Sequence, residues 1–357
     1  MNNTNIQNKI RGSLIGGAIG DALGYQIEFD VGIQEKQVTR FKGDLGIISD
    51  DTQMTLFTAN ALLWQRTNHA YHGMAMPKCE AVRHGYLDWL DTQTNSRHHD
   101  SISWIKEISE LNCRRAPGNT CISALLGTLH DGKMGTIDNP INDSKGCGSV
   151  MRVAPCGLYT EDPAEAGMLA AECAAITHGH WSGIVASYVC AAMISMITYQ
   201  DMNVEESLRE AIELVQNNLD IKHDMTPFIE MIDNVVRLSK LDIRDIDAIR
   251  QLGEGWVADE AFAIAIYSCL KHPNSFEDAV VCAVNHDGDS DSTGAITGHI
   301  VGAALGMPSI PQYYVDNVEL KDVVLEIADD LYAMATDIAV MKLDSWAKKY
   351  VDCEFSN

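Results

Sequence analysis

Apolar residues recur at helical spacing along most of the chain. Three segments show this clearly: Met54, Phe57, Ala61 and Trp64; Ala258, Ala261, Ala265 and Leu270; and Val323, Ile327, Leu331 and Met334. Because residues three or four positions apart share one face of an α-helix, this spacing predicts amphipathic helices over 54–64, 258–270 and 323–334. Alternating β-branched runs are short and few, so the pattern predicts a single all-α domain of many helices. Gly, Asp, Asn and Pro cluster in 30–50, 131–148 and 217–226, which we predict to be loops.

One segment, Trp181 to Tyr199, has no charged residue and nearly the length of a membrane-spanning helix, about 20 residues. It carries three serines, a threonine and two tyrosines, and no second segment pairs with it. We therefore predict a central helix buried in a large helical core, and no membrane partner.

Two segments place glycine at every fourth position. Gly12, Gly16, Gly20 and Gly24 form one stripe, and Gly294, Gly298, Gly302 and Gly306 form the other. Since each glycine costs a helix about 1 kcal/mol relative to alanine, four in register indicate close approach of another backbone. The two stripes are predicted to lie on helices that pack against each other, although they are far apart in sequence.

The composition is typical of a globular protein and argues against a nucleic-acid partner. The 357 residues are 46% hydrophobic and 21% charged. With 26 Lys and Arg against 50 Asp and Glu, the net charge is −24, and no basic stripe is present to bind phosphates. The ten cysteines include no Cys-x-x-Cys pair, so we expect free thiols in a reducing cytoplasm. The polar segment MNNTNIQNKIRG lacks the pattern of a signal peptide.

A dense acidic cluster precedes the second glycine stripe. Asp287, Asp289 and Asp291 alternate with Gly and Ser. An EF-hand calcium loop needs Gly at its sixth position and Glu at its twelfth, where this chain has Ser292 and Gly298. The cluster is therefore not an EF-hand.

A second acid pair, Asp50 and Asp51, begins a predicted helix in SDDTQMTLF. Helix capping explains either cluster alone, because Ser and Asp accept hydrogen bonds from the free amides of a helix N-terminus. Two caps do not require five acids, however. If the glycine-striped helices pack together, both clusters converge and need a cation, and an all-oxygen ligand set favours Mg²⁺, Mn²⁺ or Ca²⁺.

Seven sequence blocks in a fixed order carry a family resemblance. They are GSLIGGAIGDALGYQIEF, SDDTQMTLF, APGNTCISAL, GCGSVMRVAPCGL, AAITHGHWSG, GEGWVADEAFAIA and DGDSDSTGAITGHIVGAALG, spanning about 10–310. The chain resembles the ADP-ribosylglycohydrolases, which include ADP-ribosylarginine hydrolases and dinitrogenase-reductase-activating glycohydrolases. The resemblance implies one all-α, orthogonal multi-helix domain over 1–357, with C-terminal helices in 311–357 and a central dinuclear metal site.

The resemblance also implies the ligands of two Mg²⁺ or Mn²⁺ ions, which are Ser49, Asp50, Asp51, Asp289, Asp291 and Ser292. Ser49 stands where threonine is usual and keeps the hydroxyl group. Glu28, in YQIEF, matches a glutamate that approaches the metals, so Glu28 or a metal-bound aspartate such as Asp51 is expected to act as the base. Asp21 is expected to be a buried structural acid.

The expected substrate-binding residues are those of a phosphate loop and its surroundings. Backbone amides of such a loop suit an anion, and in the family this loop holds the pyrophosphate of ADP-ribose. His178 resembles a substrate-contacting histidine, Trp256 is expected on the rim near the adenosine end, and Arg152 is expected to pair with an acid. The loop residues are Gly146, Cys147, Gly148 and Ser149, with Cys147 replacing the more frequent asparagine.

The implied activity is metal-dependent hydrolysis of the glycosidic bond between C1″ of ADP-ribose and a protein side chain. Arginine is the favoured acceptor, so the expected partner is an ADP-ribosylated protein. Other interpretations stay open. The protein could neutralise an ADP-ribosyltransferase toxin as an immunity or binding protein, hydrolyse ADP-ribosyl-serine or another conjugate, or be an inactive structural relative.

Overall fold

The computed structural model describes residues 3–30, 37–96, 99–220, 222–336 and 338–351. These residues form sixteen α-helices and no β-strand, which confirms the predicted all-α class. The helices are α1 Asn3–Tyr25, α2 Asp50–His72, α3 Lys78–Thr94, α4 Asn119–Asp131, α5 Ala154–Tyr159, α6 Pro163–Ala175, α7 Trp181–Gln200, α8 Val204–Asn218, α9 Thr226–Ser239, α10 Asp245–Ile249, α11 Ala258–Lys271, α12 Phe276–Val284, α13 Ser290–Leu305, α14 Gln312–Asn317, α15 Lys321–Thr336 and α16 Asp344–Tyr350. Five short 3₁₀ turns separate some of them: η1 Trp104–Glu107, η2 Ser109–Leu111, η3 Cys147–Ser149, η4 Met307–Ser309 and η5 Ile338–Lys342.

The segments predicted from apolar spacing fall in α2, α11 and α15. Most of their apolar positions are buried because these faces turn toward the common core, and Trp64, Leu270 and Val323 are partly buried against it. The predicted loops join α1 to α2, α4 to η3 and α8 to α9, although 31–36 and 221 lie outside the described residues.

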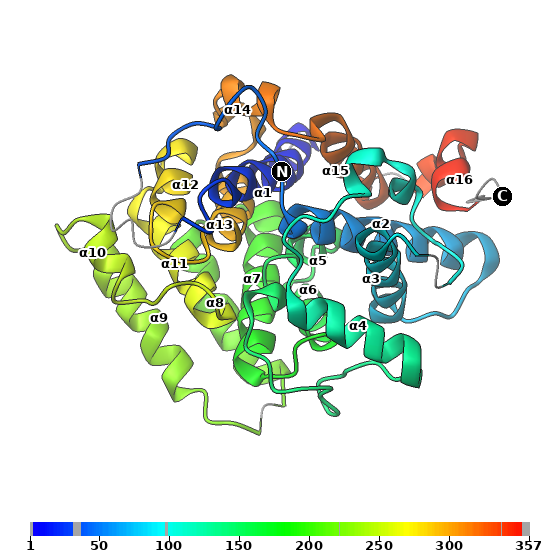
Figure 1. Ribbon diagram of the computed structural model, residues 1–357, viewed down its shortest axis with the longest axis horizontal. Helices are drawn as coiled ribbons and strands as arrows, with labels where there is room; N and C mark the ends of the chain where they lie inside the picture. Colours follow the sequence, from blue (N-terminus) through cyan, green and yellow to red (C-terminus); the bar gives the residue numbers. More distant parts are fainter. Residues whose placement is uncertain (1–2, 31–36, 97–98, 221, 337, 352–357) are drawn as a thin grey trace.

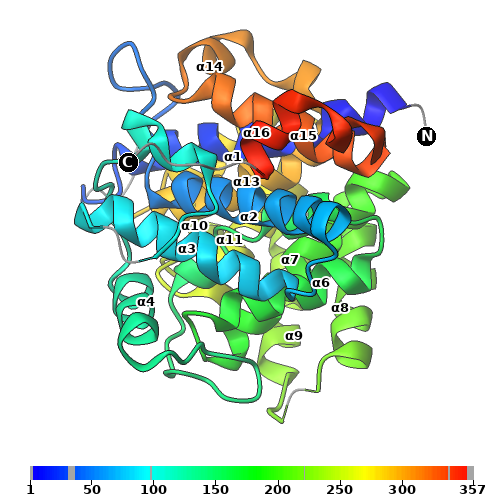
Figure 2. The same ribbon diagram turned by 90° about the vertical axis from the view of Figure 1, so that its right-hand side faces the viewer.

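Helices α1 and α13 form the central pair of the fold. They come from opposite ends of the sequence and pack against each other more extensively than any other two described elements. Figure 1 shows both near the middle of the molecule, and Figure 2 shows α14 and α15 on one side of the pair and α7 on the other. Helices α11 and α12 also pack on α13.

The glycine stripes set the register of this antiparallel pair. A Cβ on Gly16 would lie 2.4 Å from the carbonyl oxygen of Gly298, and a Cβ on Gly298 would lie 2.0 Å from that of Gly16. Gly12 and Gly302 face each other in the same way, as do Gly20 and Gly294. No side chain fits between the backbones, so the predicted close approach is confirmed.

One glycine of the predicted second stripe, Gly306, is placed differently in the structure. Gly306 does not lie on the helix face but caps the end of α13 with φ 75°, a left-handed conformation that glycine adopts without strain. At the other end, a Cβ on Gly24 would lie 2.1 Å from the carbonyl oxygen of Ser290. The last turn of α1 therefore touches the first turn of α13.

Helix α7 is the one described helix long and apolar enough to cross a membrane, and 94% of its apolar stretch is buried inside the protein. Neighbours α6, α8, α11 and α13 cover it. This confirms the predicted buried core helix. Two of its serines, Ser187 and Ser195, satisfy their hydroxyls by donating to the backbone carbonyls of Gly183 and Thr160.

Candidate metal centre

Helix α2 begins at the acid pair, and an acid from α1 holds its first turn. Asp21 accepts hydrogen bonds from the amide of Ser49 at 2.9 Å and of Thr52 at 3.0 Å, and from the Thr52 hydroxyl. Ser49 is the N-cap, and its Oγ accepts from the amide of Asp51 at 3.2 Å. With these amides satisfied, the carboxylates of Asp50 and Asp51 are not needed as caps.

Helix α13 begins at the other acid cluster. Asp289 is its N-cap and accepts from the amide of Ser292 at 3.3 Å, while its own amide donates to the carbonyl of Glu254 at 2.8 Å. The backbone of Gly288 passes so close that a Cβ there would lie 2.0 Å from the same carbonyl oxygen. The loop is thus pinned where it enters the helix.

The contact between the end of α1 and the start of α13 brings the acids together. Glu28, Asp289 and Asp291 each offer a carboxylate oxygen within 4.8 Å of the others. Asp21, Asp50 and Asp51 lie near enough to Asp291 for its charge to shift their pKa values. All of these six acids are at most 8% exposed, and in the described part of the chain none forms a salt bridge with Lys, Arg or His.

Burial, followed by the charge of Asp291, raises the pKa of Asp50, Asp51 and Asp289 well above the ordinary value. The same two causes raise the pKa of Asp21 to about 7 and that of Glu28 to about 10. The protein alone does not compensate these charges, so the centre needs either bound protons or a cation.

The donor set fits a hard divalent cation. Within this centre, two buried carboxylate oxygens, Glu28 Oε2 and Asp51 Oδ1, have no hydrogen-bond partner among the described residues. A buried carboxylate oxygen without a partner is costly, and ligation of a cation would relieve that cost. Carboxylate and hydroxyl oxygens are the ligands that Mg²⁺, Mn²⁺ and Ca²⁺ prefer.

The predicted phosphate loop lies against this centre. Gly146 pairs with Val257, and the Cys147 amide donates to the carbonyl of Trp256 at 3.2 Å. After burial, the charges of Asp289 and Asp51 raise the pKa of the Cys147 thiol, which places that side chain beside the acids. The structure therefore brings the loop, the backbone of Trp256 and the acid cluster together.

The prediction that the whole loop offers its amides to an anion is wrong in extent. The amides of Gly146, Cys147 and Ser149 donate to Ser144 Oγ, Trp256 O and Gly146 O respectively. Within the described residues, only the Gly148 amide of the four has no acceptor. Three amides hold the shape of the turn, and one is left for a ligand.

His178 lies behind the loop. It is 2% exposed, and a Cβ on Gly146 or Gly148 would lie 3.0 Å from its ring. Burial, followed by the charge of Arg152, lowers the pKa of His178 to about 3, so the imidazole is neutral near pH 7. The structure thus gives His178 a direct contact with the loop.

The expected acid partner of Arg152 is not found among the described residues. Its guanidinium lies 4.3 Å from the ring centre of Tyr86 and donates to Thr177 Oγ1 at 2.5 Å. An aromatic face and neutral acceptors therefore take the role predicted for a carboxylate.

Comparison with known proteins identifies the family. The sequence profile described as ADP-ribosylglycohydrolase matches residues 2–338. The chain belongs to the ADP-ribosylglycohydrolase family. Family membership makes it a glycohydrolase that acts on ADP-ribose conjugates and removes ADP-ribose from modified proteins.

Three relatives show how far this ADP-ribosylglycohydrolase has diverged. ADP-ribosylarginine hydrolase Tri1 of Pseudomonas putida (strain GB-1) is 24% identical over 341 residues, covering 92% of this chain and 79% of that protein. ADP-ribosyl-(dinitrogen reductase) glycohydrolase of Rhodospirillum rubrum is 23% identical over 335 residues, covering 90% and 94%. A solved structure of an ADP-ribosylglycohydrolase-related protein complex shares the fold, with a TM-score of 0.68 and 23% identity over 93% of this chain and 99% of that chain.

The segment 115–118 also lines the centre of this ADP-ribosylglycohydrolase, and it was not assigned to the site from the sequence. The Gly118 amide donates to Asp50 Oδ2 at 3.1 Å, and the Asp50 amide donates to the carbonyl of Arg115 at 3.0 Å. Arg115 in turn pairs with Glu319 at 2.9 Å. The block APGNTCISAL carried the signal, because it is a family block with a proline and a glycine before a helix, but nothing in the sequence placed it beside Asp50.

Proposed function

We propose that this ADP-ribosylglycohydrolase is a divalent-metal-dependent hydrolase that removes ADP-ribose from arginine side chains. The observation that carries the metal dependence is the group of six buried carboxylates without a basic partner among the described residues. The arginine assignment is supported by the relative named ADP-ribosylarginine hydrolase, at 24% identity.

We assign Mg²⁺ or Mn²⁺ ligation to the carboxylates of Asp50, Asp51, Asp289 and Asp291 and to the hydroxyls of Ser49 and Ser292. The two serines stand at the N-terminal turns of α2 and α13, so each half of the chain contributes one hydroxyl and two acids. When bound, divalent ions of this kind orient ribose hydroxyls and lower the pKa of a coordinated water.

Glu28 and Asp51 are the two candidates for the base. Each has a buried oxygen without a hydrogen-bond partner among the described residues, so each, when ionised beside a bound cation, can accept a proton from a water molecule without first giving up a bond. In the overall reaction, the water oxygen bonds to C1″, the bond from C1″ to the guanidine nitrogen breaks, and the leaving nitrogen gains a proton. The charge that develops on the ribose ring is positive, which the surrounding carboxylates favour.

The pyrophosphate and adenosine of the substrate are assigned to the loop and its rim. The Gly148 amide is the available donor, and Trp256, at 41% exposure, offers a ring face to a base. We assign His178 as a positioning residue, because its buried ring supports Gly146 and Gly148 from behind.

The test uses two peptides that carry ADP-ribose on arginine or on serine, with release of free ADP-ribose as the readout. With Mg²⁺ or Mn²⁺ we expect release from the arginine peptide and its loss when a chelator is added. Release from the serine peptide alone would overturn the arginine assignment. Binding of ADP-ribose without release from either peptide would replace the hydrolase with a binding or immunity role.

A further inference from the structure

A second cluster of metal-philic side chains lies away from the carboxylate centre, where three helices meet. Asp245 begins α10, His272 follows the end of α11, and Cys282 lies in α12. One ligand atom from each, a carboxylate oxygen, an imidazole nitrogen and the thiol sulfur, lies within 4.8 Å of the other two. His272 Nε2 is 2.9 Å from Asp245 Oδ2.

Neighbouring side chains hold Asp245 and Cys282 in place by hydrogen bonds. The Tyr267 hydroxyl donates to Asp245 Oδ1 at 2.8 Å, and Ser268 Oγ donates to the Cys282 sulfur at 3.4 Å. Outer hydrogen bonds of this kind orient metal ligands and strengthen their binding. Asp245 and Cys282 are therefore each oriented by a neighbour from outside the cluster.

An ion can reach the cluster from solvent. The three residues line a surface cavity of about 480 Å³ together with Thr39 and Asn285. Asp245 and His272 are half-buried, and Cys282 is buried. Three protein ligands and an open side are what a four-coordinate ion with one exchangeable position requires.

We propose that Asp245, His272 and Cys282 form a binding site for a thiophilic divalent cation, of which Zn²⁺ is the best match. A mixed oxygen, nitrogen and sulfur set suits Zn²⁺, whereas Mg²⁺ prefers oxygen ligands alone. On binding, the sulfur–hydrogen bond of Cys282 breaks, a sulfur–zinc bond forms and the proton leaves to solvent. No electron is transferred, and no partner other than the ion is required.

The directions of the pKa shifts in the cluster agree with a metal-free state in which the Cys282 thiol is protonated and Asp245 is ionised. Burial and then the charge of Asp245 raise the pKa of the Cys282 thiol. Burial alone raises the pKa of Asp245, but hydrogen bonds from His272 and Tyr267 outweigh it and lower the pKa below the ordinary value. A carboxylate that stays ionised provides the initial attraction for a cation.

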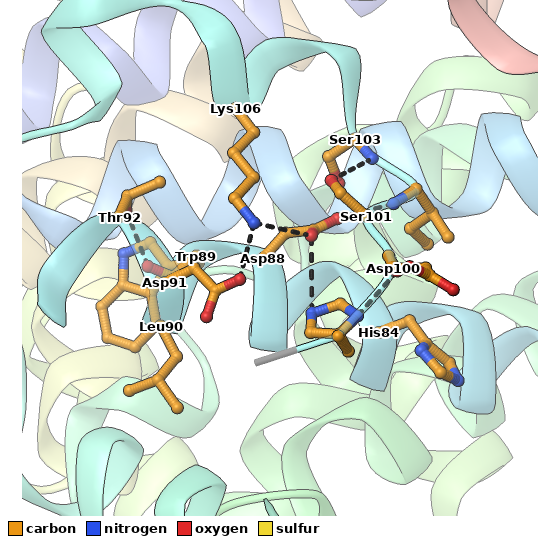
Figure 3. Close-up of polar contacts among 12 residues, drawn as sticks. His84, Asp88, Trp89, Leu90, Asp91, Thr92, Asp100, Ser101, Ser103 and Lys106 are labelled. Carbon is orange, nitrogen blue, oxygen red and sulfur yellow. Dashed lines mark hydrogen bonds and ion pairs between the residues drawn. The ribbon is translucent and has the colours of Figure 1, made fainter. Parts of the chain in front are cut away.

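A third group of possible metal ligands shows why closeness of the side chains alone does not indicate a cation site. Asp88 and Asp91 lie near His99, and the three offer ligand atoms within 4.8 Å. Figure 3 shows Lys106 reaching between the two acids, with its ammonium 2.6 Å from Asp91 and 3.5 Å from Asp88. The lysine already supplies the cation there, whereas no Lys or Arg ion pair to Asp245 is found among the described residues.

Cobalt(II) is the probe that separates this site from the carboxylate centre. The full-length protein is first saturated with Mg²⁺ to fill the oxygen-only centre, and Co²⁺ is then titrated under reducing conditions. We expect a thiolate-to-cobalt charge-transfer band that saturates at one equivalent and disappears on addition of Zn²⁺. Absence of the band would overturn the proposal.

Three variants locate the thiolate. Cys282→Ser should abolish the band, and His272→Gln, at a half-exposed position that tolerates change, should weaken Co²⁺ binding by about tenfold or more. Cys147→Ser is the matched control, because Cys147 lies beside the carboxylate centre, and it should keep the band. Loss of the band in Cys147→Ser with retention in Cys282→Ser would overturn the proposal. Unchanged Co²⁺ affinity in His272→Gln would also overturn it, whether or not Cys282→Ser folds.

Discussion

Asp21 and Asp50 carry the same side chain a few ångströms from the same centre, yet their contacts give them different roles. Both oxygens of Asp21 accept hydrogen bonds from the first turn of α2. Asp50 accepts a backbone hydrogen bond on Oδ2 alone, from Gly118. Asp21 is therefore a structural acid, as expected from the sequence, whereas Asp50 has capacity left for a cation.

Replacing Asp50 or Asp289 by asparagine should remove metal binding without unfolding the protein. Asparagine keeps the shape and is a good N-cap, so the bonds to Gly118 and Ser292 can persist, but one full charge is lost. In thermal melts, each single variant should lose most of the rise in melting temperature caused by Mg²⁺ or Mn²⁺, together with hydrolysis.

Two comparisons make this result specific. The double variant should be little worse than either single variant, because both empty the same site. Asp162→Asn changes an N-cap acid of α6 and should leave the metal response intact. Additive stability losses of about 1 kcal/mol each, with normal turnover, would mean that Asp50 and Asp289 are only caps.

In metal-free buffer, Asp21→Ala should lower the free energy of unfolding, whereas Asp50→Asn should not. It leaves the buried amides of Ser49 and Thr52 without acceptors, at a cost of about 1–3 kcal/mol for each unsatisfied group. Asp50→Asn removes a repelling charge under the same conditions and should not lower the free energy of unfolding. Urea denaturation measures both, and equal losses in the two variants would contradict the division of roles.

The α1–α13 pair is the element on which the centre depends. Its glycines let the two backbones touch, and the antiparallel register places the end of α1 against the start of α13. Glu28 follows the first end, and Asp289 stands at the second. Any change that separates the helices therefore also separates the acids.

Gly298→Ala should lower the free energy of unfolding by about 1–3 kcal/mol, the usual cost of overpacking. Its Cβ would lie 2.0 Å from the carbonyl oxygen of Gly16, so the helices must move apart. The matched control is Gly127→Ala in α4, where a Cβ meets nothing within 4 Å. This control should gain up to about 1 kcal/mol from alanine's helix propensity, and a gain at both positions would rule out close packing.

At the scale of the whole molecule, two kinds of negative charge respond differently to salt. The net charge of −24 lies mostly on the surface, where ions screen it over about 10 Å at 0.1 M ionic strength. The six acids of the centre are buried and are screened much less. Sodium chloride and magnesium therefore act on separate groups.

Chelator should lower the melting temperature of the purified protein, and a small excess of Mg²⁺ should restore it where sodium chloride of equal ionic strength does not. A cation at 100 times its dissociation constant adds about 2.7 kcal/mol to the native state. The Asp50→Asn, Asp289→Asn double variant should keep its response to sodium chloride and lose that to Mg²⁺. Full restoration by sodium chloride would show that the acids need no specific ion.

Local patterns in the sequence were sufficient for several of the helices and for the central pair. Periodicity located α2, α11 and α15, and the charge-free run located α7, because burial of one face or of a whole helix selects side chains at regular spacing. The glycine stripes predicted their own partner, since four glycines in register have a physical reason only if a second backbone approaches. From that pairing, the convergence of Asp50 and Asp289 followed.

Contacts with no regular spacing were decided only by the tertiary structure. The amides of Gly146, Cys147 and Ser149 are hydrogen-bonded within the protein, and Gly306 turns out of its stripe to end a helix. Two contacts join segments that share no sequence pattern. One is between the segment 115–118 and Asp50, and the other is the cluster of Asp245, His272 and Cys282. Their positions depend on how the sixteen helices of the described residues pack together. A contact made by one side chain or one amide has no periodic pattern in the sequence from which its partner could be inferred.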